Sequence, residues 1–295
     1  MMYTVFAYGF RIFFLSAAVY AAVLIPLWVG QLAFGLQVAG RDPMAWHAHE
    51  LLFGVVAAAI AGFLLTAVPN WTARPRLHGW MLVLLWGLWM SARIGHLIVD
   101  PAASGMPSLA LRLIDLAFLP GLALVIAAPI IESGNRRNFV MVVLLLGLFA
   151  ANLLHGTPGA AEIATTTVLD LVTLMMTLIG GRITPMFTGN WLRRTGRGEP
   201  MPVQNRWLDR AATLALLGVL IAALFDRNGV CVALLALLAG VLHLARLAGW
   251  RGWRTTADPL VWVLHLGYLW IPVGLLLRGF GILGLGIPPA AWMHA

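Results

Sequence analysis

Long uninterrupted apolar segments dominate the hydrophobic pattern of this chain. A helix needs roughly 20 predominantly apolar residues to cross about 30 Å of hydrocarbon. Segments that approach or reach this length lie at residues 12–35, 47–69, 79–99, 109–131, 138–155, 161–187, 208–225, 229–248 and 258–280. They do not alternate between apolar and polar positions, as a membrane β-strand does. The pattern therefore predicts an all-α polytopic bundle of about nine transmembrane helices, forming one domain over residues 1–295.

Composition narrows the class of protein further. Hydrophobic residues make up 61% of the chain and charged residues 10%, whereas soluble domains average about 45–50% and about 25%. The sequence thus excludes an ordinary water-soluble enzyme and a disordered protein, and its single cysteine, Cys231, excludes an intramolecular disulfide. We attribute the net charge of +8 to arginines in loops, and we expect membrane lipid, not nucleic acid, around this chain.

The placement of arginine predicts the orientation of the spans. The loops after the second, fourth, sixth and eighth segments hold Arg74, Arg76, Arg136, Arg137, Arg193, Arg194, Arg197, Arg206, Arg210, Arg251 and Arg254. The loops after the first, third, fifth and seventh segments hold only Arg41 and Arg227. Because cytoplasmic loops retain positive residues, this bias predicts a cytoplasmic N-terminus. We read the apolar stretch after Arg11 as the first span and not as a removed signal peptide.

Ionisable residues inside the apolar segments gather at two depths, and such residues usually face the bundle interior and mark function. The layer toward the outer face contains His47, His49, Glu50, Arg93, His96, Arg112, Asp115, Asn152, His155 and His294. His47 and Glu50 are three residues apart and are expected to share a helix face from which His49 points away. The layer toward the cytoplasm contains His243, His265 and Arg182. Neighbouring antiparallel spans would bring His243 and His265 face to face.

Histidines at matching depth suggest metal chemistry, because imidazole is a common ligand of haem and copper. The competing interpretation is that each ring is a hydrogen-bonded packing residue. For Arg93, Arg112, Asp115 and Asp170, structural ion pairs compete with a proton path, a contact to a haem propionate or the orientation of a ligand histidine. The sixth segment adds a polar stripe of Thr166, Asp170, Thr173 and Thr177 at helical spacing.

Four stretches together resemble the NnrS family of bacterial membrane proteins. They are RIFFLSAAVYAA from Arg11, the segment from Trp46 to Pro75 with its His-x-His-Glu start and Pro-Asn-Trp-Thr end, GGRITPMFTGN from Gly180, and LHLGYLWIPVGLLLRG from Leu264. The resemblance implies a multi-pass haem- and copper-containing protein of the bacterial inner membrane that belongs to the nitric-oxide response and accompanies denitrification and nitrosative-stress genes. By motif match it implies functional positions at His47, His49, Glu50, Arg182 and His265.

The resemblance also implies a twelve-span protein, whereas this chain ends where a tenth span would open, at Trp292–Ala295. We therefore expect a short variant or a truncated chain.

Three functional hypotheses follow. In the first, haem and copper bind His47, His49, His243 and His265, with Arg182, and His96, His155 and His294 as further metal ligands, and the protein handles nitric oxide or its metal adducts inside the membrane. In the second, the polar stripe of the sixth segment lines the path of a small-solute or proton carrier or sensor. In the third, the chain is an assembly subunit without a site of its own. The residues identify neither a catalytic group nor an electron donor.

Overall fold

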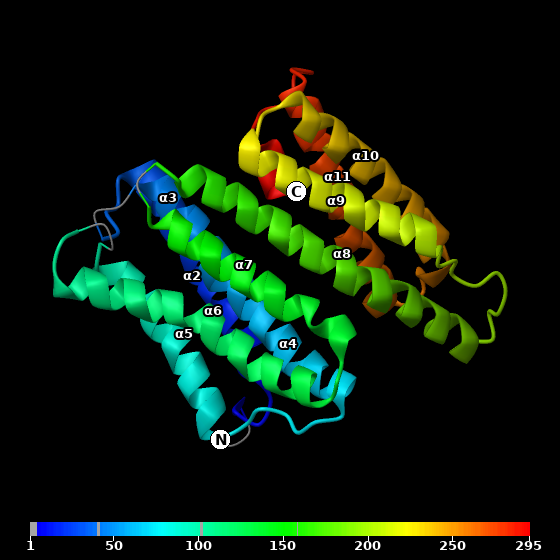
Figure 1. Ribbon diagram of the computed structural model, residues 1–295, viewed down its shortest axis with the longest axis horizontal. Helices are drawn as coiled ribbons and strands as arrows, with labels where there is room; N and C mark the ends of the chain where they lie inside the picture. Colours follow the sequence, from blue (N-terminus) through cyan, green and yellow to red (C-terminus); the bar gives the residue numbers. More distant parts are fainter. Residues whose placement is uncertain (1–4, 40–41, 101–102, 158) are drawn as a thin grey trace. The chain divides into compact units, whose positions relative to one another are not determined.

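A computed structural model describes residues 5–39, 42–100, 103–157 and 159–295. Within these ranges nine helical segments are long and apolar enough to cross a membrane, which confirms the predicted helical bundle. They are α2 (Gly9–Phe34), the composite of α3 (Pro43–His49), η1 (Glu50–Val56) and α4 (Ala57–Thr72), α5 (Trp80–Ile98), α6 (Met106–Glu132), the composite of η2 (Arg136–Asn138) and α7 (Val140–His155), α8 (Ala161–Arg194), α9 (Arg206–Phe225), α10 (Val230–Gly249) and α11 (Pro259–Ile282) (Figure 1).

The chain divides into two compact units, residues 1–168 and 169–295, and each unit is described by itself. The expectation of a single domain stays a prediction, as does the cytoplasmic N-terminus. Arg41, which entered the orientation argument, lies outside the described residues.

In the first unit, α2 packs along α4, α4 contacts α6, and α6 contacts both α5 and α7. Apolar side chains fill these contacts; Phe13, Leu64 and Leu122 are buried. Small residues allow close approach, as at Gly62, where an added Cβ would lie 3.2–3.3 Å from the Phe13 and Phe14 side chains. Without a hydrophobic driving force between helices in lipid, such close packing is a main source of their association.

The second span is not one regular α-helix. It begins at Asp42, whose side chain accepts a hydrogen bond from the Ala45 amide at 2.8 Å, with Pro43 in the first turn, as expected at a helix N-terminus. From Glu50 to Val56 the backbone is π-helical. Such wide turns are rare and occur frequently at functional sites.

In the second unit, α10 contacts both α9 and α11, and Figure 1 shows these three helices side by side. Small residues form the seam between α10 and α11: Gly240 lies against Leu276, and Gly279 lies against Leu237 and the carbonyl of Ala233. The short 3-10 helix η4 (Ala291–His294) packs against α11.

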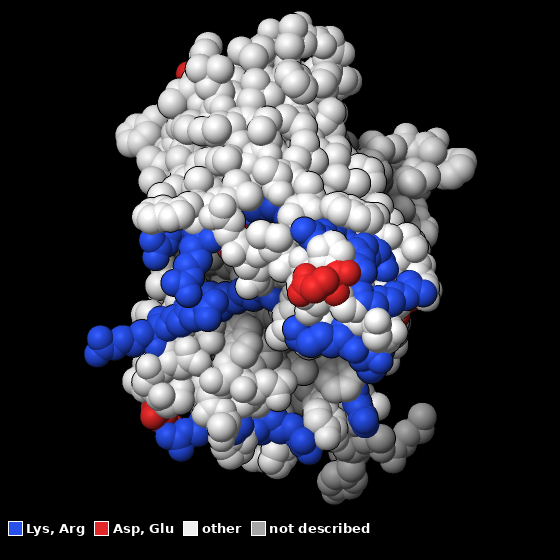
Figure 2. All heavy atoms as spheres, turned by 90° about the vertical axis from the view of Figure 1, so that its right-hand side faces the viewer, with Lys and Arg blue, Asp and Glu red and all other residues white. Residues whose placement is uncertain are grey.

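The arginine-rich segment from Arg193 to Arg210 is more helical than a solvated loop. Arg193 and Arg194 form the last turn of α8, and Arg206 opens α9 behind the Asn205 cap. Figure 2 shows arginine side chains gathered on the face that carries this segment. Arg254 fixes the connection by donating hydrogen bonds to main-chain carbonyls of the stretch 197–200. Apolar periodicity alone missed this extension because the last turn of α8 is polar.

The seam between α10 and α11 generates a first prediction. The change Gly279→Ala places a Cβ 2.9 Å from the Ala233 carbonyl oxygen, and backbone cannot move aside as a flexible side chain can. We expect a loss of about 1–3 kcal/mol of stability, the usual cost of overpacking, seen as a lower Tm of the purified protein. The matched control is Gly267→Ala on the same helix, where an added Cβ meets no atom within 4 Å. An equal Tm for the two variants would contradict the packing argument.

Candidate metal centre

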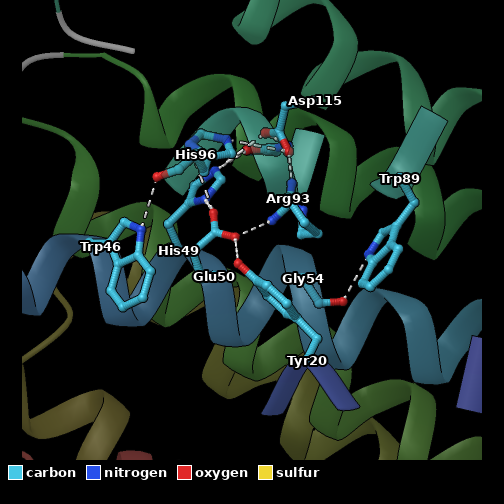
Figure 3. A network of polar contacts seen from close by, with 10 residues as sticks. Tyr20, Trp46, His49, Glu50, Gly54, Trp89, Arg93, His96 and Asp115 are labelled. Carbon is cyan, nitrogen blue, oxygen red and sulfur yellow. Dashed lines mark hydrogen bonds and ion pairs between the residues drawn. The ribbon is translucent and has the colours of Figure 1, made fainter. Parts of the chain in front are cut away.

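Glu50 is at the centre of a buried polar network in the first unit, and its side chain has no exposed surface (Figure 3). The Tyr20 hydroxyl and Arg93 Nη1, the latter at 3.0 Å, donate to Oε2 of Glu50. Nδ1 of His49 lies 2.8 Å from Oε1, and Nδ1 of His96 lies 3.8 Å from the same atom. One carboxylate therefore joins residues of α2, α3 and α5.

Arg93 connects this carboxylate to a second one. Its Nη2 donates to Oδ1 of Asp115 on α6 while Nη1 holds Glu50. All three side chains are at least nine-tenths buried. Buried charges need paired, hydrogen-bonded neighbours. Two carboxylates face one guanidinium here, and the imidazoles of His49 and His96 are the other basic groups beside them.

The imidazoles of His49 and His96 meet beside Asp115. Their ring centroids are 4.6 Å apart. Nε2 of His49 lies 3.3 Å from Asp115 Oδ2, and Nε2 of His96 lies 3.7 Å from Oδ1. One potential ligand atom from each residue lies within 4.8 Å of the other two. Asn152 on α7 donates to Asp115 at 3.0 Å, and its oxygen lies 3.3 Å from His49 Nε2.

Glycine and tryptophan residues shape the walls of this network. A Cβ at Gly54 would lie 2.8 Å from the Tyr20 ring and 3.2 Å from Arg93, so only glycine lets both side chains reach Glu50. The Gly54 carbonyl accepts from the Trp89 indole at 3.1 Å. Trp46 donates to the His96 carbonyl at 3.2 Å, which ties α3 to the end of α5.

A cavity of about 490 Å³ lies beside the two imidazoles. His155 and Arg112 line it together with His49, His96 and Asp115. The His155 ring packs edge-on to His49, with 5.1 Å between centroids. Arg112 is exposed and reaches the Gly156 carbonyl at 3.4 Å. The structure thus brings together His49, His96, His155, Glu50, Arg93, Arg112 and Asp115 from the predicted outer layer.

The described ring contact of His47 lies outside this network. Its ring stacks on Trp28 of α2 at 4.0 Å between centroids. Glu50 contacts Tyr20 of the same helix, and the expectation that His47 and Glu50 share a helix face stays a prediction. His49, which was expected to point away from that face, also engages Glu50, its chain neighbour.

The second unit contains a separate polar cluster on α9, α10 and α11. Arg246 donates from Nε to Asp209 at 2.7 Å and from Nη1 to the Tyr268 hydroxyl at 2.6 Å. The same hydroxyl lies 2.7 Å from Nδ1 of His243, which is fully buried. His265 pairs through Nε2 with Thr188 at 2.7 Å.

His243 and His265 do not meet face to face. The described ring contacts of His243 are with Tyr268, and those of His265 are with Trp250. Trp250 packs against Tyr268 at 4.5 Å. The two histidines are thus linked by aromatic side chains, because α11 presents Tyr268 one turn away from His265.

Three further predicted residues are Arg182, His294 and Asp170. Arg182 is half-buried on α8, one residue after Gly181, which packs against Arg246. His294 is exposed, and its Nδ1 lies 3.1 Å from the Ala290 carbonyl. Asp170 forms a buried ion pair with Arg278 at 2.6 Å.

The polar stripe of the sixth span is mostly satisfied within its own helix. Thr166 and Thr173 donate to carbonyls one turn earlier, whereas the buried hydroxyl of Thr177 has no hydrogen-bond partner in the described part of the chain. The hydroxyl hydrogens of Thr166 and Thr173 are therefore used within α8.

Sequence reasoning missed Tyr20, Tyr268, Arg246, Asp209 and Arg278. Two signals could have found them. Tyr20 and Tyr268 lie inside the quoted stretches RIFFLSAAVYAA and LHLGYLWIPVGLLLRG. Arg246 lies three residues after His243 on α10, the same helical spacing that identified other pairs.

Comparison with known proteins identifies the family. No curated protein matches the chain, and no solved structure matches it. The family model described as NnrS protein matches residues 4–295, which is nearly the whole chain. This multi-pass membrane protein, with nine apolar helices among its described residues, therefore belongs to the NnrS family.

Proposed function

We propose that this chain is a haem- and copper-containing protein of the bacterial inner membrane that handles nitric oxide, or metal adducts of nitric oxide, in the nitrosative-stress response of denitrifying cells. Family membership supports a role in the nitric-oxide response. The observation that carries the metal assignment is the convergence of His49, His96 and Asp115 from three different helices inside the apolar bundle.

The donor set fits copper. Imidazole nitrogen suits copper, zinc, iron and nickel, and one carboxylate completes a three-ligand site with room for a further ligand. Nε2 of His49 and Nε2 of His96 both face Asp115. Their Nδ1 atoms face Glu50, and a carboxylate on the far ring nitrogen fixes the tautomer and raises the basicity of the ligand nitrogen.

The cavity beside these ligands fits a larger group. Its volume of about 490 Å³ lies within the range of about 300–1,000 Å³ for ligand and cofactor pockets. His155 offers an imidazole to a haem iron, and Arg112 offers a guanidinium to a haem propionate. The second cluster is packed more tightly: a Cβ at Gly180 would lie 2.9 Å from the Tyr268 ring, which leaves no space for a macrocycle there.

The protein's own groups define what such a centre does. Copper or haem bound there would supply the affinity for nitric oxide. The chain supplies a site within the apolar bundle, where a small apolar gas dissolves, and a fixed set of ligands. Arg93 and Asn152 hold Asp115 in place, while Tyr20 and Arg93 hold Glu50. These contacts prevent the carboxylates from turning away when the ligand sphere changes.

The metal assignment is tested by metal analysis and an optical spectrum of protein purified from membranes. We expect bound copper and a Soret band in the unaltered chain. His49→Ala and His96→Ala each remove one of the three candidate ligands, so we expect at least a tenfold loss of copper. His78→Ala, at an exposed loop histidine, is the matched control and should retain the full content.

Copper that remains at full occupancy in both site variants would overturn the ligand assignment. A structural collapse is distinguished by circular dichroism and gel filtration, because a variant that keeps its helical content and elution volume has lost ligands rather than its fold.

Glu50 gives a second prediction. Glu50→Gln keeps the size and one hydrogen-bond acceptor but removes the negative charge beside both Nδ1 atoms. Changes to groups that orient metal ligands typically lower metal affinity about 10–100-fold, and we expect a decrease of that size in competition titrations against a copper chelator. Glu132→Gln, at an exposed position at the end of α6, serves as the control. Equal affinities for the two variants would show that Glu50 does not support the ligands.

A further inference from the structure

The hydrogen bonds of the second cluster have a direction. Arg246 carries only donors, so its bond to the Tyr268 hydroxyl at 2.6 Å places the Tyr268 oxygen as the acceptor. The hydroxyl has a single hydrogen, and Nδ1 of His243 lies 2.7 Å away. Tyr268 therefore donates to Nδ1, and in the neutral ring of His243 the proton resides on Nε2.

The same reasoning applies to His265. Thr188 uses its hydroxyl hydrogen for the Thr184 carbonyl at 2.9 Å, so its oxygen accepts from Nε2 of His265 at 2.7 Å. Nδ1 of His265 then carries the lone pair. This atom is buried without a hydrogen-bond partner in the described chain, and it lies against Gly252, where an added Cβ would come within 2.6 Å of it.

His49 has different neighbours. In the first unit a carboxylate faces each ring nitrogen of His49, Glu50 at Nδ1 and Asp115 at Nε2. In the second unit a hydroxyl donor faces Nδ1 of His243 and leaves Nε2 as a buried N–H without a partner among the described residues. A protonated nitrogen cannot bind a metal, whereas it can donate to an oxygen or nitrogen lone pair.

We propose that Tyr268 and Thr188 are positioning residues that hold His243 and His265 as their Nε2–H tautomers, so that His243 presents a buried N–H donor at Nε2 and is not a metal or haem ligand. The partner of this donor must offer a lone pair, and the charge of Arg246 beside it is balanced by Asp209 at 2.7 Å. The inference rests on the proposed function only for its contrast with the first unit.

Arg246 also argues against a proton path through this cluster. Asp209 is about one-third exposed and could start a proton path toward His243. Arg246 separates the two groups, and a guanidinium does not give up its proton in a protein. The cluster therefore orients a donor and does not conduct protons.

The test is nitrogen-15 NMR of the full chain in lipid nanodiscs with labelled histidine, because protonated and unprotonated ring nitrogens have well-separated shifts. The His243 and His265 signals are assigned by their loss in His243→Gln and His265→Gln. We expect an unprotonated Nδ1 and a protonated Nε2 on both rings. Tyr268→Phe should convert the single His243 tautomer to a mixture, and Thr188→Val should do the same for His265 alone.

Two controls keep the substitutions comparable. Tyr8→Phe and Thr173→Val make the same chemical changes at residues without a described contact to either ring, and both should leave the His243 and His265 signals unchanged. If a variant unfolds, the tautomers of the unaltered chain still decide the question.

An unprotonated Nε2 on His243 would overturn the inference. So would a His243 signal that is broadened in copper- or haem-loaded protein and restored by removal of that group. Failure of the proposed function is a separate outcome, because it appears as unchanged copper in the His49→Ala variant and does not alter these shifts.

Discussion

The structure of the first unit depends on the guanidinium of Arg93, which lies between two carboxylates where water does not reach. Removing one partner from a buried ion pair typically costs about 3–5 kcal/mol, because the remaining charge stays unsolvated. Glu50 and Asp115 belong to different helices, so this charge requirement fixes the positions of the second, third and fourth spans relative to one another. Tyr20 and Asn152 extend the same constraint to the first and fifth spans. The imidazoles of His49 and His96 take their orientation from these fixed carboxylates.

Much of the fold could be predicted because few backbone structures are stable inside a membrane. Apolar length is read directly from sequence, and backbone groups in lipid must be satisfied within a helix. The predicted span at 229–248 differs from α10 by one residue at each end. The predicted span at 161–187 is shorter than α8, which continues to Arg194. Its last turn holds Arg193 and Arg194, and an apolar pattern cannot detect a polar helix end. The division into two units left no signal in composition.

The depth of the site residues in the bundle could be predicted from the sequence, but the neighbours that their side chains contact could not. Helix rise placed Arg93, His96 and Asp115 in one layer, and the structure joins them. Helical spacing gave no indication that His49 and Glu50, which are adjacent in the chain, contact one another. Tyr268 was missed for a different reason: an aromatic residue in an apolar stretch resembles lipid-facing packing until its hydroxyl is seen beside Arg246.

The π-helical stretch from Glu50 to Val56 affects how the second span tolerates amino-acid substitutions. An extra residue absorbed in a wide turn shifts the angular phase of everything that follows it. The N-terminal part of this span, α3, bears the imidazoles and is held through the contacts of Glu50, whereas α4, which ends at Thr72, is held by its own contacts with α2 and α6. Substitutions that rotate α4 then need not rotate α3. The geometry around the histidines of α3 is thereby preserved.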